Sequence, residues 1–366
     1  MHLAIILSSL RGGGAERVML SLAEGLANNG HQVDLVVSNA TGPLLNSIPE
    51  GIHLVDLSSN RVLRSTIGLT NYLKCHKPDI AISALPHVNL VTVIAKLIAC
   101  VNTKTILTEH NTLSQSIRNS RTLKGRYIYL GMKLLYRFSN SIVAVSRGVA
   151  DDLATTINID RSAISVIYNP VVTETLLLNA KKPVDHPWFL DKQLKVVLGV
   201  GRLTYAKNFS TLIRAFSRID NIHNTRLVIL GEGEDRTELE RLIIELKLVD
   251  VVDLLGFVTN PYKFMYRSNI FVLSSRWEGL PTVLIEAMAC GTEIISTDCP
   301  SGPREILENG AWGTLIPVGD EDALVESLNQ SLRRQAPKLS PQSFSQYEFS
   351  YSVKQYDYLL ECLLVK

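Results

Sequence analysis

Two glutamates eight positions apart are the strongest candidates for chemistry in this sequence. They lie in "RWEGLPTVLIEAMACG" (Arg276–Gly291), where Glu278 falls in a Gly/Pro turn and Glu286 in an apolar stretch. Pro281 can start a helix there and Gly291 can end it, so Glu286 is expected on a helix that Glu278 precedes. A carboxylate that is buried without a partner costs free energy, and Glu286 therefore needs either a partner or a ligand.

Two cations follow a predicted strand in the second half of the chain. In "GVGRLTYAKNFSTLIRAF" (Gly199–Phe216) the strand ends at Gly201, and Arg202 and Lys207 come before the next helix. The fork of Arg fits phosphate oxygens, and Lys supplies a compact charge. Beside a helix N-terminus the two could neutralise a diphosphate. The alternative is a pair of solvated surface charges.

Three consecutive glycines, Gly12–Gly14, occupy the first strand-to-helix junction, "SSLRGGGAERVML". Glycines let the backbone approach an anion, and a helix that starts at Ala15 would offer it free N–H groups. The alternative is a tight turn, which explains one glycine better than three. The pattern is not G-x-G-x-x-G, and Asp34 lies within a predicted strand, so dinucleotide binding is poorly supported.

His110 lies at the C-terminal end of another predicted strand, in "KTILTEHN". A lone histidine is more often structural than catalytic, and only its position at a strand end favours a functional role. The acidic triplet 320–322 contains a formal D-x-D but precedes a helical pattern. We therefore interpret it as the acidic start of a helix and predict no metal site.

One segment is basic and rich in aromatic residues. Between His110 and Ala150 there is no Asp or Glu, and Tyr, Phe and Leu alternate with the charges. The basic residues are Arg118, Arg121, Lys124, Arg126, Lys133, Arg137 and Arg147. We expect contact with an anionic membrane surface or with lipid phosphates, especially through Arg118, Arg121, Lys124 and Arg126. The alternative is an ordinary sheet-covering helix; nucleic acid fits less well, because the charge is confined to one segment.

The elements that position these residues follow one pattern from end to end. Short β-branched runs alternate with amphipathic stretches, which predicts parallel sheets wrapped by helices. The predicted strands are 3–7, 32–38, 79–85, 104–110, 141–146 and 164–170, then 195–201, 226–231, 251–257, 270–275 and 293–298. The Pro-rich, charged stretch 181–193 interrupts the pattern and is expected to be the linker region. Two doubly wound halves would place their ligands at the C-terminal ends of the strands, in a cleft between them.

Composition sets the remaining limits. The 366 residues suffice for two domains, and their net charge of +2 divides into +6 for residues 1–170 and −4 for the rest, so an anionic partner is expected at the first half. The five scattered cysteines form no C-x-x-C pair, which favours reduced cytosolic thiols. The apolar opening lacks a preceding Lys or Arg and predicts a strand better than a signal peptide, and the longest apolar run is too short to span a bilayer.

Taken together, the motifs resemble those of the retaining glycosyltransferases of family 4. The similarity covers nearly the whole chain and rests on the order of the motifs: "GGGAE", "AVSRGV", "GVGRL" with its later "KN", the two glutamates of E-x7-E, and "STDCPSGPREIL". It implies a GT-B fold, with two tandem Rossmann-like doubly wound domains that face each other across a cleft. Residues 1–170, joined by a C-terminal helix at about 347–366, would bind the acceptor, and residues 171–346 the nucleotide-sugar donor.

The resemblance also implies roles for particular residues. Arg202 and Lys207 would hold the leaving diphosphate, Glu278 the donor sugar and Glu286 the ribose, and His110 would lie near the reacting carbon. The remaining donor contacts would come from Gly13, Gly14, Gly201, Gly279, Leu280 and Thr282. Both glutamates would then await ligand hydroxyls and stand unsatisfied without them. No metal or other cofactor is expected, since the cations take its place. Glu293 departs from the proline that family members often have near this position, which puts the local geometry in doubt.

The resemblance thus predicts transfer of a hexose or N-acetylhexosamine from a UDP-sugar to a saccharide, with the anomeric configuration retained. The acceptor would be lipid-diphosphate-linked and belong to bacterial surface glycan synthesis, with the enzyme peripheral at the cytoplasmic face of the membrane. No nucleic acid partner is expected. Two alternatives remain: a nucleotide-sugar epimerase or hydrolase, and a non-catalytic sugar-nucleotide binding protein.

Overall fold

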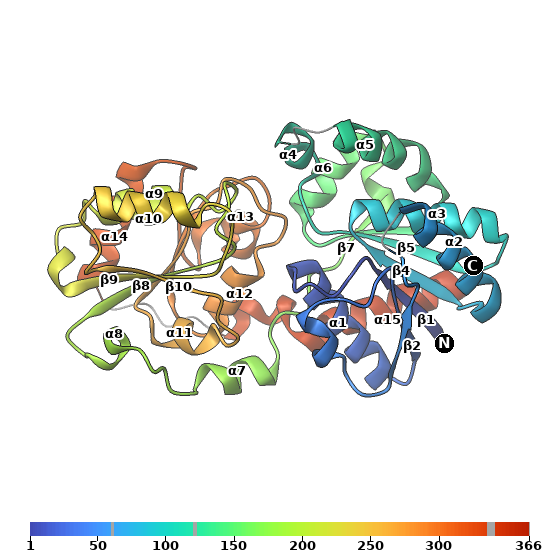
Figure 1. Ribbon diagram of the computed structural model, residues 1–366, viewed down its shortest axis with the longest axis horizontal. Helices are drawn as coiled ribbons and strands as arrows, with labels where there is room; N and C mark the ends of the chain where they lie inside the picture. Colours follow the sequence, from blue (N-terminus) through green and yellow to red (C-terminus); the bar gives the residue numbers. More distant parts are fainter. Residues whose placement is uncertain (60–61, 120–122, 335–340, 366) are drawn as a thin grey trace. The chain divides into compact units, whose positions relative to one another are not determined.

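The protein consists of two compact α/β units. The structure, a computed structural model, describes residues 1–59, 62–119, 123–334 and 341–365. Unit 1 comprises Met1–Pro170 together with Gln346–Lys366, and unit 2 comprises Val171–Ser345. Each unit has its own parallel sheet with helices on both faces (Figure 1). The predicted fold class, two doubly wound parallel-sheet domains in tandem, is confirmed.

The described part of unit 1 contains a seven-stranded parallel sheet in the order β3-β2-β1-β4-β5-β6-β7. Its strands are β1 (His2–Leu7), β2 (Gln32–Val37), β3 (Ile52–Asp56), β4 (Ile80–Ala84), β5 (Lys104–Glu109), β6 (Ser141–Ala144) and β7 (Ile164–Val166). Its helices are α1 (Gly14–Asn28), α2 (Val62–His76), α3 (Pro86–Ala99), α4 (Leu113–Asn119), α5 (Leu123–Leu135), α6 (Arg147–Ile157) and α15 (Phe349–Val365). The order of the strands reverses between β1 and β4, the position at which sheets of this kind bind ligands.

Alternation along β1 explains the two cores of unit 1. Leu3, Ile5 and Leu7 point to one face and pack with α1 and α15, whereas Ala4 and Ile6 point to the other face and pack with α2 and α3. All five are buried. A strand that is covered on both faces has no polar side to show, which is why its sequence is continuously apolar.

The C-terminal helix α15 packs on α1 at a glycine. A Cβ atom added to Gly25 would lie 2.3 Å from Cγ2 of Val353, so the helices approach too closely there for any larger residue. Asp357 of α15 accepts hydrogen bonds from Asn29 and from Nε2 of His31, the latter at 2.9 Å. The last helix of the chain therefore belongs to the core of unit 1.

The described part of unit 2 contains a six-stranded parallel sheet in the order β10-β9-β8-β11-β12-β13. Its strands are β8 (Lys195–Val200), β9 (Thr225–Leu230), β10 (Val252–Gly256), β11 (Ile270–Leu273), β12 (Glu293–Thr297) and β13 (Thr314–Ile316). Its helices are α7 (Glu174–Ala180), α8 (Pro187–Leu190), α9 (Phe209–Phe216), α10 (Arg236–Glu245), α11 (Tyr262–Arg267), α12 (Thr282–Ala289), α13 (Pro303–Ile306) and α14 (Glu321–Arg333). Helices α9, α10 and α14 lie together over one face of this sheet, and α11 lies over the other (Figure 1).

Three features of the fold differ from the sequence-based expectation. The strands β3 and β13 were not predicted; both are edge strands, β3 is only partly buried and β13 has three residues, so neither shows a continuous apolar run. The stretch 181–193 is not a linker between the units, because it lies inside unit 2 and contains α8. His186 at the start of α8 contacts Asp253 at 3.2 Å, which ties this stretch to β10.

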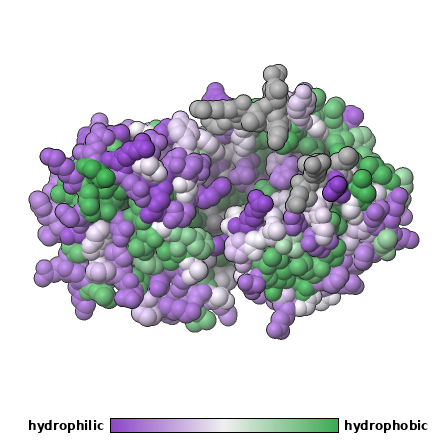
Figure 2. All heavy atoms as spheres, viewed as in Figure 1, coloured by the Kyte–Doolittle hydropathy of each residue, from purple (hydrophilic) through white to green (hydrophobic). Residues whose placement is uncertain are grey.

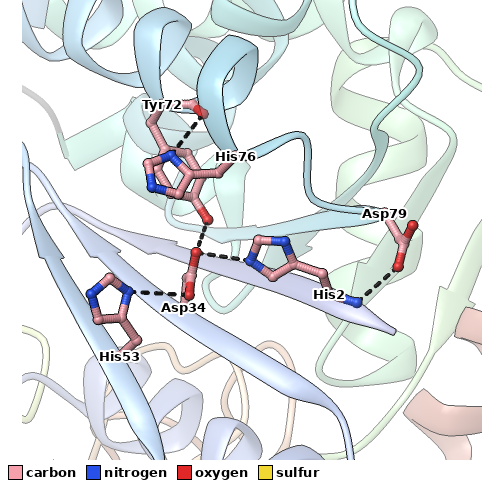
Figure 3. Close-up of polar contacts among 6 residues, drawn as sticks. All are labelled: His2, Asp34, His53, Tyr72, His76 and Asp79. Atoms are coloured by element: carbon pink, nitrogen blue, oxygen red, sulfur yellow. Dashed lines mark hydrogen bonds and ion pairs between the residues drawn. The ribbon is translucent and has the colours of Figure 1, made fainter.

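Asp34 lies inside β2 and is a structural residue (Figure 3). Its carboxylate is buried and accepts hydrogen bonds from the hydroxyl of Tyr72 at 2.5 Å and from ring nitrogens of His2 at 2.9 Å and His53 at 3.3 Å. Burial acts to raise the pKa of Asp34, but these hydrogen bonds outweigh it and the pKa lies below its ordinary value. The prediction that Asp34 lies within a strand and not at its end is confirmed.

Candidate active site

The carboxyl ends of β8 and β9 approach each other unusually closely in unit 2. The N–H of Gly201 donates to the carbonyl of Leu230 at 2.9 Å. Gly231 has φ +141°, and a Cβ atom there would lie 1.9 Å from the carbonyl oxygen of Gly201. Only glycine fits such an approach, which brings the loop after β8 tightly against the end of β9.

This loop presents two cations in different states. The Nζ atom of Lys207 lies 2.6 Å from Oε1 of Glu278, and both side chains are largely buried, with 20% and 12% of their surfaces exposed. Ser275 donates a further hydrogen bond to the same carboxylate oxygen at 2.6 Å. Arg202 is exposed and makes no hydrogen bond or ion pair with the described residues. The loop therefore carries one neutralised cation and one available cation.

The turn that contains Glu278 is held by the "CPSG" segment that follows β12. The N–H of Glu278 donates to the carbonyl of Pro300 at 3.3 Å, and the hydroxyl of Ser301 donates to the carbonyl of Gly279 at 2.9 Å. Gly302 has φ +94°, and a Cβ atom there would lie 2.4 Å from Cδ of Pro281. The two motifs thus form one packed unit, although 22 positions separate Ser301 from Gly279.

Helix α12 confirms the predicted boundaries, since Pro281 caps it and Gly291 follows it with φ +78°. Glu286 is half-buried on this helix. The expectation that both glutamates stand unsatisfied is wrong: Glu278 is bonded to Lys207 and Ser275, and Glu286 is not without a partner either. Leu280 and Gly279 are buried in the turn, and Thr282 begins the helix with its side chain half-buried.

His110 directly follows β5 in unit 1, and its hydrogen bonds define its tautomer. The hydroxyl of Thr108 donates its one proton to the carbonyl of Ser83 at 2.9 Å, so it can only accept from Nε2 of His110 at 3.0 Å. The proton of the neutral imidazole is therefore on Nε2, and Nδ1 is the acceptor. Burial lowers the pKa of His110 to about 4, which keeps the ring neutral at pH 7.

The neighbouring Glu109 fixes the end of β5 through buried hydrogen bonds. Its carboxylate is fully enclosed and accepts hydrogen bonds from the hydroxyl of Tyr136 and from Nδ2 of Asn89, the latter at 2.8 Å. Burial raises the pKa of Glu109 to about 7, although these hydrogen bonds act against the rise. The network joins β5 to α3 and to the turn after α5, and so restricts the movement of His110.

The glycine loop of unit 1 already binds a carboxylate of its own unit. Helix α1 begins at Gly14, and the N–H of Gly13 donates to Oε2 of Glu16 at 2.8 Å. Ser9 donates to the other oxygen of Glu16 at 3.2 Å. The carboxylate takes one of the free N–H groups, and its charge opposes an anion there. The role predicted for Gly13 and Gly14 therefore stays a prediction.

Comparison with known proteins establishes the family. Residues 12–175 match the family described as Glycosyltransferase Family 4, and residues 182–348 match that described as Glycosyl transferases group 1. The chain is 32% identical over 342 residues, and 90% of each chain, to the N-acetylgalactosamine-N,N'-diacetylbacillosaminyl-diphospho-undecaprenol 4-alpha-N-acetylgalactosaminyltransferase of Campylobacter jejuni. The chain belongs to glycosyltransferase family 4. The resemblance predicted from its motifs is confirmed.

Other comparisons of this glycosyltransferase agree. A second Campylobacter jejuni protein, GalNAc-alpha-(1->4)-GalNAc-alpha-(1->3)-diNAcBac-PP-undecaprenol alpha-1,4-N-acetyl-D-galactosaminyltransferase, is 27% identical over 96% of both chains. Among solved structures, Anabaena Alr3699/HepE in complex with UDP superposes with a TM-score of 0.81 at 19% identity, over 99% of this chain and 100% of that one. At this level of identity the likeness concerns the fold, which is GT-B as expected.

The residues predicted to bind acceptor or membrane in this glycosyltransferase are only partly described. Arg118 is exposed in the last turn of α4. Arg121 lies outside the described residues, and Lys124 and Arg126 lie on α5 with side chains outside the described part. Within the described residues, no helix is long and apolar enough to cross a membrane. On the face drawn in Figure 2, hydrophilic side chains predominate and hydrophobic ones gather in separate groups.

Two acidic positions that the sequence analysis singled out in this glycosyltransferase have structural partners. Asp320 caps α14 by accepting from the N–H of Ala323 at 2.9 Å, which confirms the predicted helix start. Glu293, where the family pattern is broken, is buried at the start of β12 and pairs with Arg334 at 2.8 Å and with Ser331 at 2.5 Å. Across the described ranges, no three His, Cys, Asp or Glu side chains gather as a metal site requires.

Proposed function

We propose that this glycosyltransferase moves a hexose or N-acetylhexosamine from a UDP-sugar to a lipid-diphosphate-linked saccharide, with retention of the anomeric configuration. The observation that carries the donor half is the loop after β8, which contains both Arg202 and Lys207, the partner of Glu278. The acceptor class is supported by the Campylobacter jejuni relative, whose name specifies a diphospho-undecaprenol-linked saccharide. Both Campylobacter names also specify N-acetylgalactosaminyl transfer, which favours an N-acetylhexosamine donor.

Each donor residue has a definite task in this proposal. Arg202 holds a phosphate oxygen with its guanidinium fork, and Lys207 bridges the diphosphate and Glu278, since an ammonium has three donors. The two cations stabilise the charge that develops on the leaving diphosphate, and no metal is required. Glu278 accepts from the donor sugar, and Glu286 on α12 accepts from the ribose. Gly201, Gly279, Leu280 and Thr282 shape the surrounding pocket.

His110 is proposed to act as a hydrogen-bond acceptor near the reacting carbon. Its Nδ1 atom carries the lone pair, because Nε2 donates to Thr108. A neutral imidazole in this tautomer can accept from a sugar hydroxyl without adding charge. We propose no covalent nucleophile; the leaving diphosphate accepts the proton of the acceptor hydroxyl on the same face of the sugar.

Membrane contact is proposed for α5 and the turn after it. Four apolar side chains follow a helical spacing and are strongly exposed, with Tyr127 at 71%. They are Tyr127, Leu130, Leu134 and Phe138. Lys133 and Arg137 are exposed beside them, whereas Met132 and Tyr136 face the core. An apolar stripe flanked by cations suits the interface of an anionic membrane, which supports the proposal of a peripheral enzyme.

The donor proposal is tested with the full-length protein, a panel of UDP-sugars and a synthetic lipid-diphosphate-linked saccharide. We expect UDP release that depends on the acceptor, and loss of transfer by at least about 100-fold in Glu286→Ala and Lys207→Ala, since each removes a charged donor contact. Glu245→Ala and Lys192→Ala remove the same residue types from exposed positions of unit 2 and serve as controls. Full activity in both site variants would refute the assignment, and conversion of UDP-sugar without acceptor would indicate an epimerase or hydrolase.

The membrane proposal is tested separately by flotation with vesicles of phosphatidylglycerol and phosphatidylcholine. Leu130→Gln with Leu134→Gln, and Lys133→Gln with Arg137→Gln, should each weaken binding by about tenfold, and the second effect should vanish at high salt. Ile244→Gln alters an even more exposed apolar residue of unit 2 and is the control. Binding that is unchanged in both double variants would exclude α5 as the contact.

A further inference from the structure

A cavity of about 490 Å³ lies at the amino ends of β12 and β13 in unit 2. Thr292 and Glu293 line it where β12 begins, the turn 309–313 lines it before β13, and Arg334 lines it directly after α14. The strands of this sheet are parallel, so the cavity is at the opposite edge from the loop after β8 and has no part in the proposed donor site. Its volume falls within the ~300–1,000 Å³ range of small-molecule sites.

Glu293 contributes a buried carboxylate to the lining of this cavity. Its side chain is 5% exposed. The hydrogen bonds that this side chain makes with described residues all reach one oxygen: Oε1 accepts from Ser331 at 2.5 Å and from Nη2 and Nε of Arg334 at 2.8 and 3.1 Å. The other oxygen, Oε2, accepts no hydrogen bond from any described residue. Since a buried carboxylate oxygen without a donor costs free energy, Oε2 is suited to accept from a ligand.

The packing of unit 2 gives little reason for a carboxylate at position 293. Replacing a buried ion pair by apolar side chains is often neutral or stabilising, and Arg334 is 54% exposed, which screens the pair further. The proline that family members often have near this position needs no ionic partner. Glu293 is therefore better explained by what it can bind.

The lining also offers donors and is neutral as a whole. The Nη1 group of Arg334 makes no hydrogen bond with the described residues. The hydroxyl of Thr314, half-buried at the start of β13, is likewise without a partner among them. Glu293 and Arg334 are the charged residues of the described lining, and their charges cancel. A neutral ligand whose groups both donate and accept matches this arrangement.

Trp312 and Ile294 add an apolar surface to the cavity. A Cβ atom at Gly313 would lie 2.9 Å from Cβ of Ile294, so the turn before β13 packs directly on β12 and holds Trp312 in the lining. The Nε1–H of Trp312 is enclosed and bonds to no described residue, so the indole contributes apolar surface and not a donor. An indole beside a carboxylate and a guanidinium suits a sugar ring, whose C–H face is apolar and whose hydroxyls both donate and accept.

We propose that this cavity is a saccharide-binding site, separate from the donor pocket, that binds one neutral sugar ring. Adjacent hydroxyls of the sugar donate to Oε2 of Glu293 and accept from Arg334, a third bonds to Thr314, and the C–H face packs on Trp312. The inference goes beyond the proposed function, because it needs neither a nucleotide nor a transfer step. Such a site holds a saccharide on unit 2 independently of the reaction.

The test uses ¹⁹F NMR on the full-length protein labelled with fluorotryptophan. The chain has three tryptophans, Trp188, Trp277 and Trp312, and Trp312→Phe identifies the resonance of the cavity. Galactose, glucose and their 2-acetamido derivatives are the probes. We expect at least one of them to shift the Trp312 resonance with a Kd of roughly 1–10 mM, the range that a single sugar ring allows, and with no dependence on salt. UDP should instead shift Trp277, which precedes Glu278, so each ligand is located by its own resonance.

Two variants test the contacts. Glu293→Gln should weaken sugar binding by at least about tenfold, because a neutral amide replaces the charged acceptor, and Thr314→Val by about threefold. Thr314→Val removes a hydroxyl that has no partner among the described residues, so it tests the site even if Glu293→Gln unfolds, which thermal unfolding shows. Glu245→Gln, an exposed carboxylate of unit 2, should leave the Kd unchanged.

Three results would overturn the proposal. They are no Trp312 shift up to roughly 100 mM sugar, the same Kd in both variants as in the wild type, and tighter binding of guanosine than of any sugar, which would mean a nucleobase site. The proposed function fails on different evidence: if UDP moves no resonance and no sugar is transferred, the response of Trp312 still decides whether the cavity binds saccharides.

Discussion

Glu278→Gln should strengthen the binding of UDP while it abolishes sugar transfer. In the free protein Glu278 neutralises Lys207 through a contact of 2.6 Å. UDP carries the diphosphate but no donor sugar, so it gains nothing from Glu278 and meets only its negative charge. UDP-sugar, by contrast, would lose the charged acceptor that Glu278 offers to the sugar hydroxyls, since glutamine keeps only a neutral amide oxygen there. The two ligands should therefore respond to the same substitution in opposite directions.

The size of the effect follows from the geometry of the pair. A phosphate oxygen that contacts Lys207 on its free side would lie roughly 5 Å from the Glu278 carboxylate, the sum of two hydrogen-bond lengths. At an effective dielectric constant of about 20, the repulsion at that distance is about 3 kcal/mol. Both side chains are partly exposed, which screens the repulsion, and the glutamine keeps a weak bond to Lys207. We expect a net gain of about 1–2 kcal/mol, or roughly 5- to 30-fold in the Kd of UDP.

Isothermal titration with UDP and with a non-hydrolysed UDP-sugar measures both responses, and Lys207→Met should weaken both ligands. Glu245→Gln, an exposed carboxylate of the same unit, controls for the change in net charge. Thermal unfolding with and without UDP shows that the variants are folded. UDP binding that weakens in Glu278→Gln as much as in Lys207→Met would refute the reasoning, because it would mean that the ion pair itself, and not the free ammonium, holds the diphosphate.

Three further predictions concern unit 1. Gly25→Ala should destabilise unit 1 by about 1–2 kcal/mol despite the better helix propensity of alanine, since the new Cβ meets Val353, and it should be nearly neutral when combined with Val353→Ala. Circular dichroism measures this loss, and the unfolding transition seen by tryptophan fluorescence, which comes only from unit 2, should not shift. A stabilised Gly25→Ala protein would disprove the clash. Thr108→Val should shift the His110 proton from Nε2 toward Nδ1 in ¹⁵N NMR at pH 7, with Thr108→Ser restoring it; an unchanged tautomer would contradict the assignment. Asp34→Asn should lower the free energy of unfolding by about 1–3 kcal/mol. This difference from the wild type should be full above pH ~4 and should disappear as acid protonates the wild-type carboxylate, because the pKa of Asp34 is lower in the folded protein than in the unfolded one. A difference that stays constant down to pH 2 would exclude this linkage.

The sequence predicted the central strands and the edge strands β7 and β10, and it missed the edge strands β3 and β13 for a physical reason. Strands covered on both faces, such as β1 and β8, must be continuously apolar, and that pattern is visible without a structure. Edge strands need no such run, so β3 and β13 carry only a partial signal. The stretch 181–193 looked like a linker because Pro and charge suit exposed loops, and those features do not reveal that α8 packs within unit 2.

The residues of the candidate site could be chosen from the sequence, but the contacts between them could not be predicted. Lys207 and Glu278 could each be chosen from residue type and position, yet their pairing joins positions 71 apart and depends on the pairing of β8 with β11 in the sheet. The network around Glu109 was missed, although a carboxyl group at the end of the strand "KTILTE" was a usable signal, because a buried Glu needs donors. Thr108 was missed as well; it lies two residues before His110 and therefore on the same face of the chain.

The expectation of unsatisfied carboxylates failed in an informative way. Several groups chosen as ligand-binding already have a partner within their own unit: Lys207 has Glu278, the N–H of Gly13 has Glu16, and Nε2 of His110 has Thr108. Since a buried polar group without a hydrogen bond is costly, a folded but empty site satisfies its own groups. A ligand then gains only the difference between the new contact and the one it replaces or shares. Removing an internal partner can therefore tighten one ligand while it abolishes the reaction, and the opposite responses of UDP and UDP-sugar to Glu278→Gln measure that difference directly.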